Sequence, residues 1–134
     1  MRHLNLLAGL LLSGQSLAGP IDFGQAGKYN AFIKEDYSVT SSDVEGRVAI
    51  GGNFSVNGGY DIGTQILDYG MGDGPSLVVG GDIVKTGTGS LNIYQSATLP
   101  NPVLGDVVLG GTFSGGPSSL GSITENSSNL PVDF

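Results

Sequence analysis

Three short apolar runs along the chain each end in a double glycine. Because side chains alternate between the two faces of a strand, the first and third apolar residues of each run share one face. The runs are "VAIGGNF" at 48–54, "LVVGGDI" at 77–83 and "VVLGGTF" at 107–113. A unit that recurs at intervals of 29 and 30 residues predicts a solenoid, in which each coil buries its apolar face against the next. We therefore expect an all-β fold, a parallel β-helix-like stack of coils (β-solenoid). A β-sandwich with glycine-rich turns is the alternative.

The double glycines are expected to form corners of this stack. Glycine takes a positive φ at little cost, and it also lets two backbones approach closely, so either property would explain the pairs. The pairs are Gly51 and Gly52, Gly80 and Gly81, and Gly110 and Gly111. Asn53, Asp82 and Thr112 follow the pairs at equivalent positions, and we predict that they form a polar ladder along one corner.

The segments between the repeats are less regular. Residues 23–39 fit either a short helix or a strand that caps the first coil. Short strands are expected at Ile66–Leu67 and around Leu91 and Ile93. The polar segment 114–134 is expected to be a loop.

The chain begins like a secreted protein. A short basic start precedes the apolar run "LNLLAGLLL" at 4–12, and "SLA" at 16–18 supplies small residues for cleavage. We predict a secretory signal peptide at 1–18 and one domain at 19–134. No later apolar run is long enough to cross a bilayer, so we expect no membrane insertion after removal of the signal.

The composition narrows the possible chemistry. The chain has no cysteine, and its one histidine, His3, lies in the predicted signal peptide. The exported part therefore lacks Ser-His-Asp or Cys-His catalysis and zinc sites built on these ligands. After the signal, four basic residues stand against twelve acidic ones, which disfavours nucleic acids and anionic membranes as partners.

The segment "DVEGR" at 43–47 holds the strongest candidate site. Strand alternation would place Asp43, Glu45 and Arg47 on one face and Gly46 on the other. The structural interpretations are an ion pair on that face, or hydrogen bonds from Arg47 to the carbonyls of a neighbouring coil. The functional interpretations are ligand binding by the three side chains, or acid/base chemistry by the two carboxylates.

Other polar groups suggest weaker sites. Asp68 and Asp73 lie in a glycine-rich loop that would suit either calcium or a solvated turn, but their spacing is not that of an EF-hand. We therefore expect no cofactor and no resident metal, with calcium as the alternative. Thr86 and Thr88 form a single Thr-x-Thr pair of the kind that ice-binding solenoids repeat in arrays. The five tyrosines would either anchor a ligand or complete the core; they are Tyr29, Tyr37, Tyr60, Tyr69 and Tyr94.

The segment "YNAFIKEDYSVTSSDVEGRVAIGGNFSV" at 29–56 resembles the opening of the choice-of-anchor A domain, a family of exported bacterial surface adhesive domains, some labelled collagen-binding. The matching motif runs from Asp43, Glu45, Gly46 and Arg47 to Gly51, Gly52 and Asn53, and "SLVVGGDI" at 76–83 and "GDVVLGGTF" at 105–113 match later units. The resemblance covers roughly residues 20–134. In such domains a segment like "LPVDF" at 130–134 leads into further elements, so the resemblance implies an incomplete domain.

The resemblance implies a non-enzymatic adhesive domain that is secreted, with possible retention at the cell surface through a part outside this chain. Its partner would be an extracellular matrix protein or a surface glycan. Two alternatives remain: a β-helical polysaccharide-acting enzyme that uses Asp43 and Glu45, and an ice-binding β-solenoid.

Overall fold

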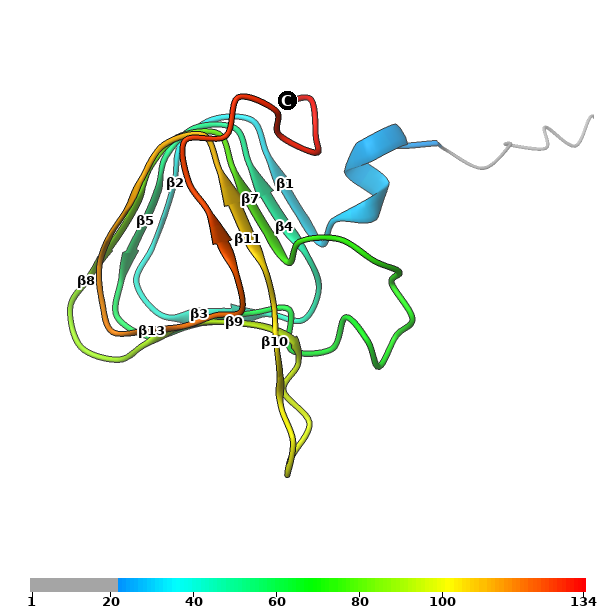
Figure 1. Cartoon of the computed structure of the whole chain (residues 1–134), viewed down its shortest axis with the longest axis vertical. Helices are drawn as coiled ribbons and strands as arrows, with labels where there is room; N and C mark the ends of the chain where they lie inside the picture. Colours follow the sequence, from blue (N-terminus) through cyan, green and yellow to red (C-terminus); the bar gives the residue numbers. More distant parts are fainter. Residues whose placement is uncertain (1–21) are drawn as a thin grey trace, which may run out of the picture.

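The computed structural model describes residues 22–134, so the predicted signal peptide at 1–18 lies outside the described residues. The chain winds into a stack of coils with a triangular outline, and each side of the triangle is one β-sheet (Figure 1). Sheet A forms the right-hand side, sheet B the left-hand side and sheet C the base in that view. The prediction of an all-β solenoid is confirmed.

The strands of each sheet come from successive coils and run parallel, apart from one antiparallel strand in sheet C. Sheet A contains β1 (Ala31–Ile33), β4 (Val48–Ile50), β7 (Leu77–Val79), β11 (Val107–Leu109) and β14 (Ile123–Thr124). Sheet B contains β2 (Tyr37–Val39), β5 (Phe54–Asn57), β8 (Ile83–Thr86) and β12 (Phe113–Gly115). Sheet C contains β3 (Ser42–Val44), β6 (Tyr60–Ile62), β9 (Leu91–Ser96), β13 (Ser118–Ser119) and the antiparallel β10 (Val103–Leu104). A 3-10 helix, η1 (Gly24–Lys28), precedes the first coil.

The three repeats stack in the predicted register. Val48 pairs with Leu77, and Leu77 pairs with Val107, so the first residue of each apolar run lies beside its equivalents in sheet A. After the corner, Phe54 pairs with Ile83, and Ile83 with Phe113, in sheet B. The inward side chains of the three sheets form one continuous hydrophobic core. Stacking of like side chains from coil to coil is therefore the main source of burial.

The glycine pairs confirm only one of the two expected reasons for their presence. None of the six has a positive φ; the positive-φ glycines of the described chain lie elsewhere. Close approach is the reason, because a Cβ at Gly80 would overlap the carbonyl oxygen of Gly51, and one at Gly110 would overlap that of Gly80. The corners between sheets A and B are therefore packed backbone to backbone.

The polar ladder along this corner is confirmed. The side-chain oxygen of Asn53 accepts a hydrogen bond of 2.9 Å from the backbone N–H of Asp82, and Asp82 in turn accepts one of 2.8 Å from the backbone N–H of Thr112. The ladder extends one coil further in each direction. Asp36 accepts from the N–H of Asn53, and Glu125 accepts from the N–H of Phe113. Each side chain thus satisfies a corner N–H that no strand partner reaches.

The segment 23–39 contains both expected elements, since η1 is a short helix and β1 and β2 pair with β4 and β5 and so cap the first double-glycine coil. Two other local predictions were wrong. Residues 64–70 form turns, and Ile66 is buried there without belonging to a strand. The segment 114–134 is not a simple loop, since β13 and β14 within it add a partial last coil.

The outer face of sheet A is covered by the end of the chain. Ala49 and Val78 point outward from this sheet, yet both are fully buried, because Val132 packs against them. The ring of Phe134 lies 5.5 Å from that of Phe32, centre to centre, and extends the same small cluster. Among the described residues no helix is long and apolar enough to span a membrane.

Candidate binding surface

The three sheets differ in what they offer to a partner. Sheet A is covered by the C-terminal segment. Within residues 22–134 nothing covers the outer faces of sheets B and C, and strand alternation decides which side chains stand on them. The residues of these two faces are therefore the candidates for binding.

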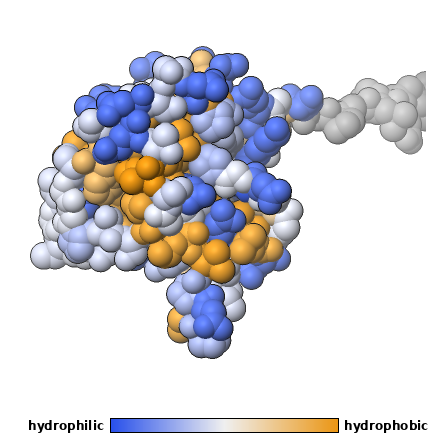
Figure 2. Space-filling view, in the orientation of Figure 1, coloured by the Kyte–Doolittle hydropathy of each residue, from blue (hydrophilic) through white to orange (hydrophobic). Residues whose placement is uncertain are grey.

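The outer face of sheet B, termed here the B face, is uncharged and made of small side chains. Every one of its residues is exposed, and they alternate along each strand with buried or half-buried neighbours. They are Ser38, Ser55, Asn57, Val84, Thr86 and Ser114. In Figure 2 the corresponding left-hand margin is pale, which marks residues that are neither strongly hydrophilic nor strongly hydrophobic.

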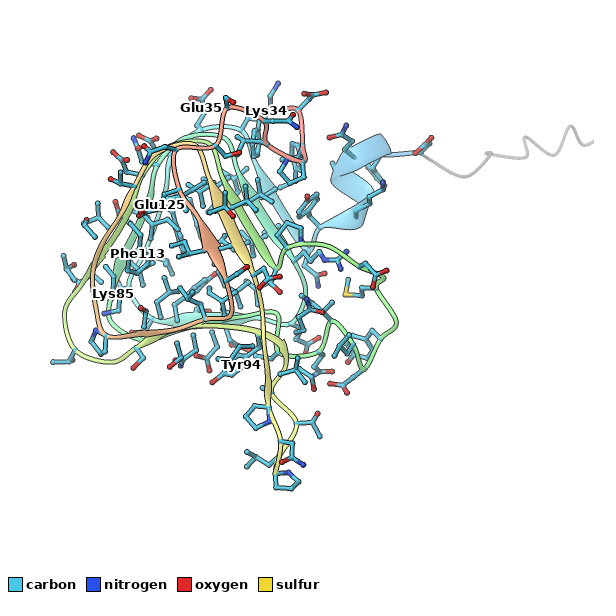
Figure 3. The ribbon with its side chains drawn as sticks, in the orientation of Figure 1. Lys34, Glu35, Lys85, Tyr94, Phe113 and Glu125 are labelled. Carbon is cyan, nitrogen blue, oxygen red and sulfur yellow. The ribbon has the colours of Figure 1, made fainter. Side chains whose placement is uncertain are left out.

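The B face is regular as well as uncharged. Ser38, Ser55, Val84 and Ser114 are consecutive partners across the four strands, and Asn57 is paired with Thr86 in a second row. Neighbouring strands in a sheet are about 4.8 Å apart, so the residues within each row follow one another at that interval. One charged residue, Lys85, lies on these strands but points inward, where it is 2% exposed and its Nζ donates to the carbonyl of Thr86 at 2.7 Å (Figure 3).

The outer face of sheet C is acidic and interrupted. Asp43, Asp61, Asn92 and Ser119 stand in register across it. The amide of Asn92 donates a hydrogen bond of 2.7 Å to Asp61, so part of this row is already engaged within the protein. The hairpin formed by β9 and β10 projects beyond this face (Figure 1). Sheet C is therefore less flat than sheet B.

The structure separates the three residues of the predicted site. The prediction that they share one strand face is therefore wrong. Asp43 stands on the outer face of sheet C. The strand ends at Val44, and the chain bends at Glu45 and Gly46. Gly46 is buried at this bend, where a Cβ would overlap the side chain of Asn30. Because alternation holds only within a strand, it does not carry through the corner.

Arg47 turns into the corner between sheets C and A. It is 5% exposed, and its two terminal nitrogens donate to the carbonyls of Met71, at 3.0 Å, and of Gly72. Of the two structural interpretations, hydrogen bonds to carbonyls are thus the one observed, although the carbonyls belong to the loop 63–76 instead of a strand. Within residues 22–134 the guanidinium has no ion pair, and its Nε has no hydrogen-bond partner.

Glu45 and Asp68 take part in local hydrogen bonds. Glu45 accepts from the side-chain amide of Gln65 at 3.4 Å. Asp68 accepts from Ser96 at 3.0 Å and from Thr98 at 3.2 Å, and so ties the loop 63–76 to the end of β9. Over residues 22–134 there is no group of three or more acidic, histidine or cysteine side chains that could hold a metal ion. Asp73 is exposed in the same loop.

Two of the tyrosines belong to the core. Tyr60 is 2% exposed, and its ring lies edge-on to Phe54, which stacks on Tyr37 at 5.7 Å between ring centres. Burial, and then the hydrogen bond between the hydroxyls of Tyr37 and Tyr60, raises the pKa of Tyr60 well above its usual value. Tyr69, by contrast, is 61% exposed in the loop 63–76. None of these three lies on the B face.

The sequence contains a signal for the B face outside its recognisable motifs. In each repeat the residue after the corner aromatic or isoleucine points outward, which gives Ser55, Val84 and Ser114. Thr86 of the Thr-x-Thr pair does lie on the B face, while Thr88 lies in the next bend. No array of such pairs extends across the four strands of sheet B.

Comparison with known proteins shows the family to which the sequence belongs. No curated protein and no solved structure matches the chain. A family model described as "Putative Ice-binding-like adhesive domain" matches residues 22–134, which are the residues of the solenoid and its short leading helix. The chain therefore belongs to the family of ice-binding-like adhesive domains.

Proposed function

We propose that this chain works outside the cell as a non-enzymatic adhesive domain and that it meets its partner through the B face. Membership of an adhesive family supports the general role. The observation that carries the assignment to a surface is the exposed, uncharged and regular outer face of sheet B.

Physical chemistry favours this face over the other two for contact with a large partner. Binding a charged face removes charges from water, which costs free energy unless each charge finds a partner. The B face carries no charge, so that cost does not arise there. Its short side chains also lose little rotamer freedom when they are immobilised. A repeating row of small polar groups suits a partner that is itself repetitive.

The partner we propose is an extracellular matrix protein or a surface glycan. Export would depend on the signal peptide predicted at 1–18. We also propose that the chain is related to choice-of-anchor A domains, which would fit the same role. Both partner classes present regularly spaced carbonyl or hydroxyl groups, which serine, threonine and asparagine side chains can bind by hydrogen bonds.

Ice is a second candidate partner, because the residues within a row of the B face follow one another at a fixed interval and include both hydroxyl groups and an apolar side chain, Val84. The test is the shape of ice crystals grown slowly in the presence of the full chain. Faceted crystals would support ice as the partner. Round, unshaped crystals at high protein concentration would count against it.

The adhesive proposal is tested by thermal melts and direct binding of the full chain with immobilised collagen peptides and a glycan panel. A ligand that binds only the folded state raises the melting temperature, and the rise grows with the logarithm of the ligand concentration once this exceeds the Kd. One class of ligand that is retained and that raises the melting temperature would support the proposal. A cooperatively folded chain that retains no member of either class would contradict this choice of partner.

A further inference from the structure

A hollow lies at the corner between sheets C and A, on the far side of the triangle from the B face. It has a volume of about 490 Å³ and is lined by η1, by Arg47 and by the loop 63–76. Its lining residues are Gly27, Lys28, Arg47, Gly70, Met71, Gly72 and Asp73. Figure 1 shows η1 and this loop on the same side of the stack, opposite sheet B. The volume is in the range that holds a small-molecule ligand.

The charge on Arg47 is incompletely compensated. The residue is only 5% exposed, yet among residues 22–134 no carboxylate forms an ion pair with it and its Nε has no hydrogen-bond partner. A buried charge without a counter-charge is costly, and two carbonyl dipoles offset only part of that cost. Asp73, the one carboxylate that lines the adjoining hollow, makes no hydrogen bond to the guanidinium, so an anion bound in the hollow would add counter-charge. The arginine is also held in place by its bonds to Met71 and Gly72, so it would not need to be ordered on binding.

A second cation lines the same hollow. Lys28, at the end of η1, borders it and also borders a smaller neighbouring hollow that Arg47 shares. The chain carries few positive charges: after the predicted signal they are Lys28, Lys34, Arg47 and Lys85. Two of these four residues line one hollow, although the formal net charge of the protein is −7. Positive charge is therefore concentrated at this hollow.

We propose that this hollow binds the carboxylate of an acidic saccharide unit, with Arg47 and Lys28 as its cationic contacts. Arg47 supplies a fixed guanidinium and Lys28 a mobile ammonium, which together suit a carboxylate. Gly70 and Gly72 leave room beside the backbone for a sugar ring, since an added Cβ at either would meet nothing within 4 Å. Asp73 is the one carboxylate in the lining, and it opposes the bound anion. The site does not depend on the B face or on the adhesive role.

The test is a titration of the full chain with sodium D-glucuronate, followed by the NMR shifts of the amides at Gly70 and Gly72. Neutral D-glucose, which lacks the carboxylate, is the matched ligand control. We expect glucuronate to bind at least about tenfold more tightly than glucose, because the charge-assisted contacts supply most of the affinity. Glucuronate binding no tighter than glucose, or no binding of either, would overturn the proposal.

Single substitutions of charged residues test which side chains contact the glucuronate. Lys28→Gln should weaken glucuronate binding about three- to tenfold, whereas Lys34→Gln, the same charge change at the corner between sheets A and B, should leave it unchanged (Figure 3). Asp73→Asn should strengthen binding severalfold. Arg47→Gln should abolish it, but this variant also loses the bonds to the loop, so Lys28→Gln is the deciding variant. Equal effects of the changes at Lys28 and Lys34 would show a general charge effect and would contradict the site.

Discussion

The side-chain oxygen of Asn53 lies 2.9 Å from the backbone nitrogen of Asp82, one coil further along the stack. The same relationship recurs between Asp82 and the backbone nitrogen of Thr112, at 2.8 Å. A side chain in one coil therefore completes the backbone hydrogen bonding of the next. The ladder is what lets the chain turn the corner between sheets A and B without orphaned N–H groups.

Removal of Asp82 from this ladder should destabilise the fold. Asp82→Ala leaves both the N–H and the hydroxyl of Thr112 without their acceptor, and a lost hydrogen bond to a charged group costs about 1.5–3 kcal/mol. Urea denaturation should show this loss in the free energy of unfolding. Ser55→Ala, an exposed change on the adjacent strand, is the control and should alter it by less than about 0.5 kcal/mol. Equal effects of the two changes would mean that the ladder does not contribute to the stability of the fold.

Substitution of a corner glycine should lower the stability of the fold more than substitution of a glycine that has open space around it. A Cβ at Gly80 would overlap the backbone of Gly51, which a rotamer change cannot relieve. Gly80→Ala should therefore cost about 2 kcal/mol or more. At Gly59 the nearest atom to an added Cβ is 3.8 Å away, so Gly59→Ala is the matched control. The comparison of their melting temperatures tests this, and similar values would contradict the close-approach explanation.

Alkaline pH should weaken the fold through Tyr60. Its pKa in the folded state is raised, first by burial and then by the hydrogen bond to Tyr37. Above about pH 10 the unfolded chain loses this proton while the folded chain keeps it, so stability falls by about 1.4 kcal/mol per pH unit.

The predicted fall in stability with rising pH is checked by urea denaturation at several pH values above 9. Tyr60→Phe should reduce the slope of stability against pH, because phenylalanine has no proton to lose. Tyr69→Phe, a change at an exposed tyrosine, should leave the slope as it is in the unmodified chain. A slope that Tyr60→Phe does not change would show that other groups cause the alkaline loss.

The C-terminal segment should detach from the outer face of sheet A when a charged side chain replaces its buried apolar one. Val132 is 5% exposed against Ala49 and Val78, so Val132→Asp would bury a carboxylate in an apolar cluster. We expect the segment 127–134 to become accessible to proteases while the inner core stays folded. Val103→Asp, at a position that is 45% exposed, should have no such effect. Unchanged protease resistance in Val132→Asp would show that the cover is held by other contacts.

The sequence predicted the middle coils well because each carries the same local signal. The runs that end at Gly51, Gly80 and Gly110 gave the strands, the register and the polar ladder. The first coil turns its corner at Lys34 and Glu35 instead of at a double glycine, so the sequence predicted it only as a helix or a capping strand and not as a further repeat. The last coil was missed because its strands β13 and β14 are two residues each and polar.

The binding surfaces were harder to predict, because they depend on contacts between distant parts of the chain. Alternation correctly places Asp43 outward, but it fails for Arg47 beyond the bend at Gly46. Which sheet is free depends on Val132 covering sheet A, and no local pattern near β4 or β7 reveals that contact. Lys28 and Arg47 line one hollow because η1 and the loop 63–76 lie beside the same corner, which no local pattern predicts.

One pair of variants tests the central claim, which is that the B face makes the adhesive contact. Ser55→Glu places a charge in the middle of the B face, and Ser119→Glu places the same charge on the outer face of sheet C. The measurement is the retention of each full-length variant on the ligand that the unmodified chain binds, with melting temperatures as a check on folding. We predict that Ser55→Glu weakens retention at least about tenfold and that Ser119→Glu leaves it unchanged, because only the first buries an unpaired charge at the contact. Retention that Ser119→Glu abolishes and Ser55→Glu does not affect would contradict the account.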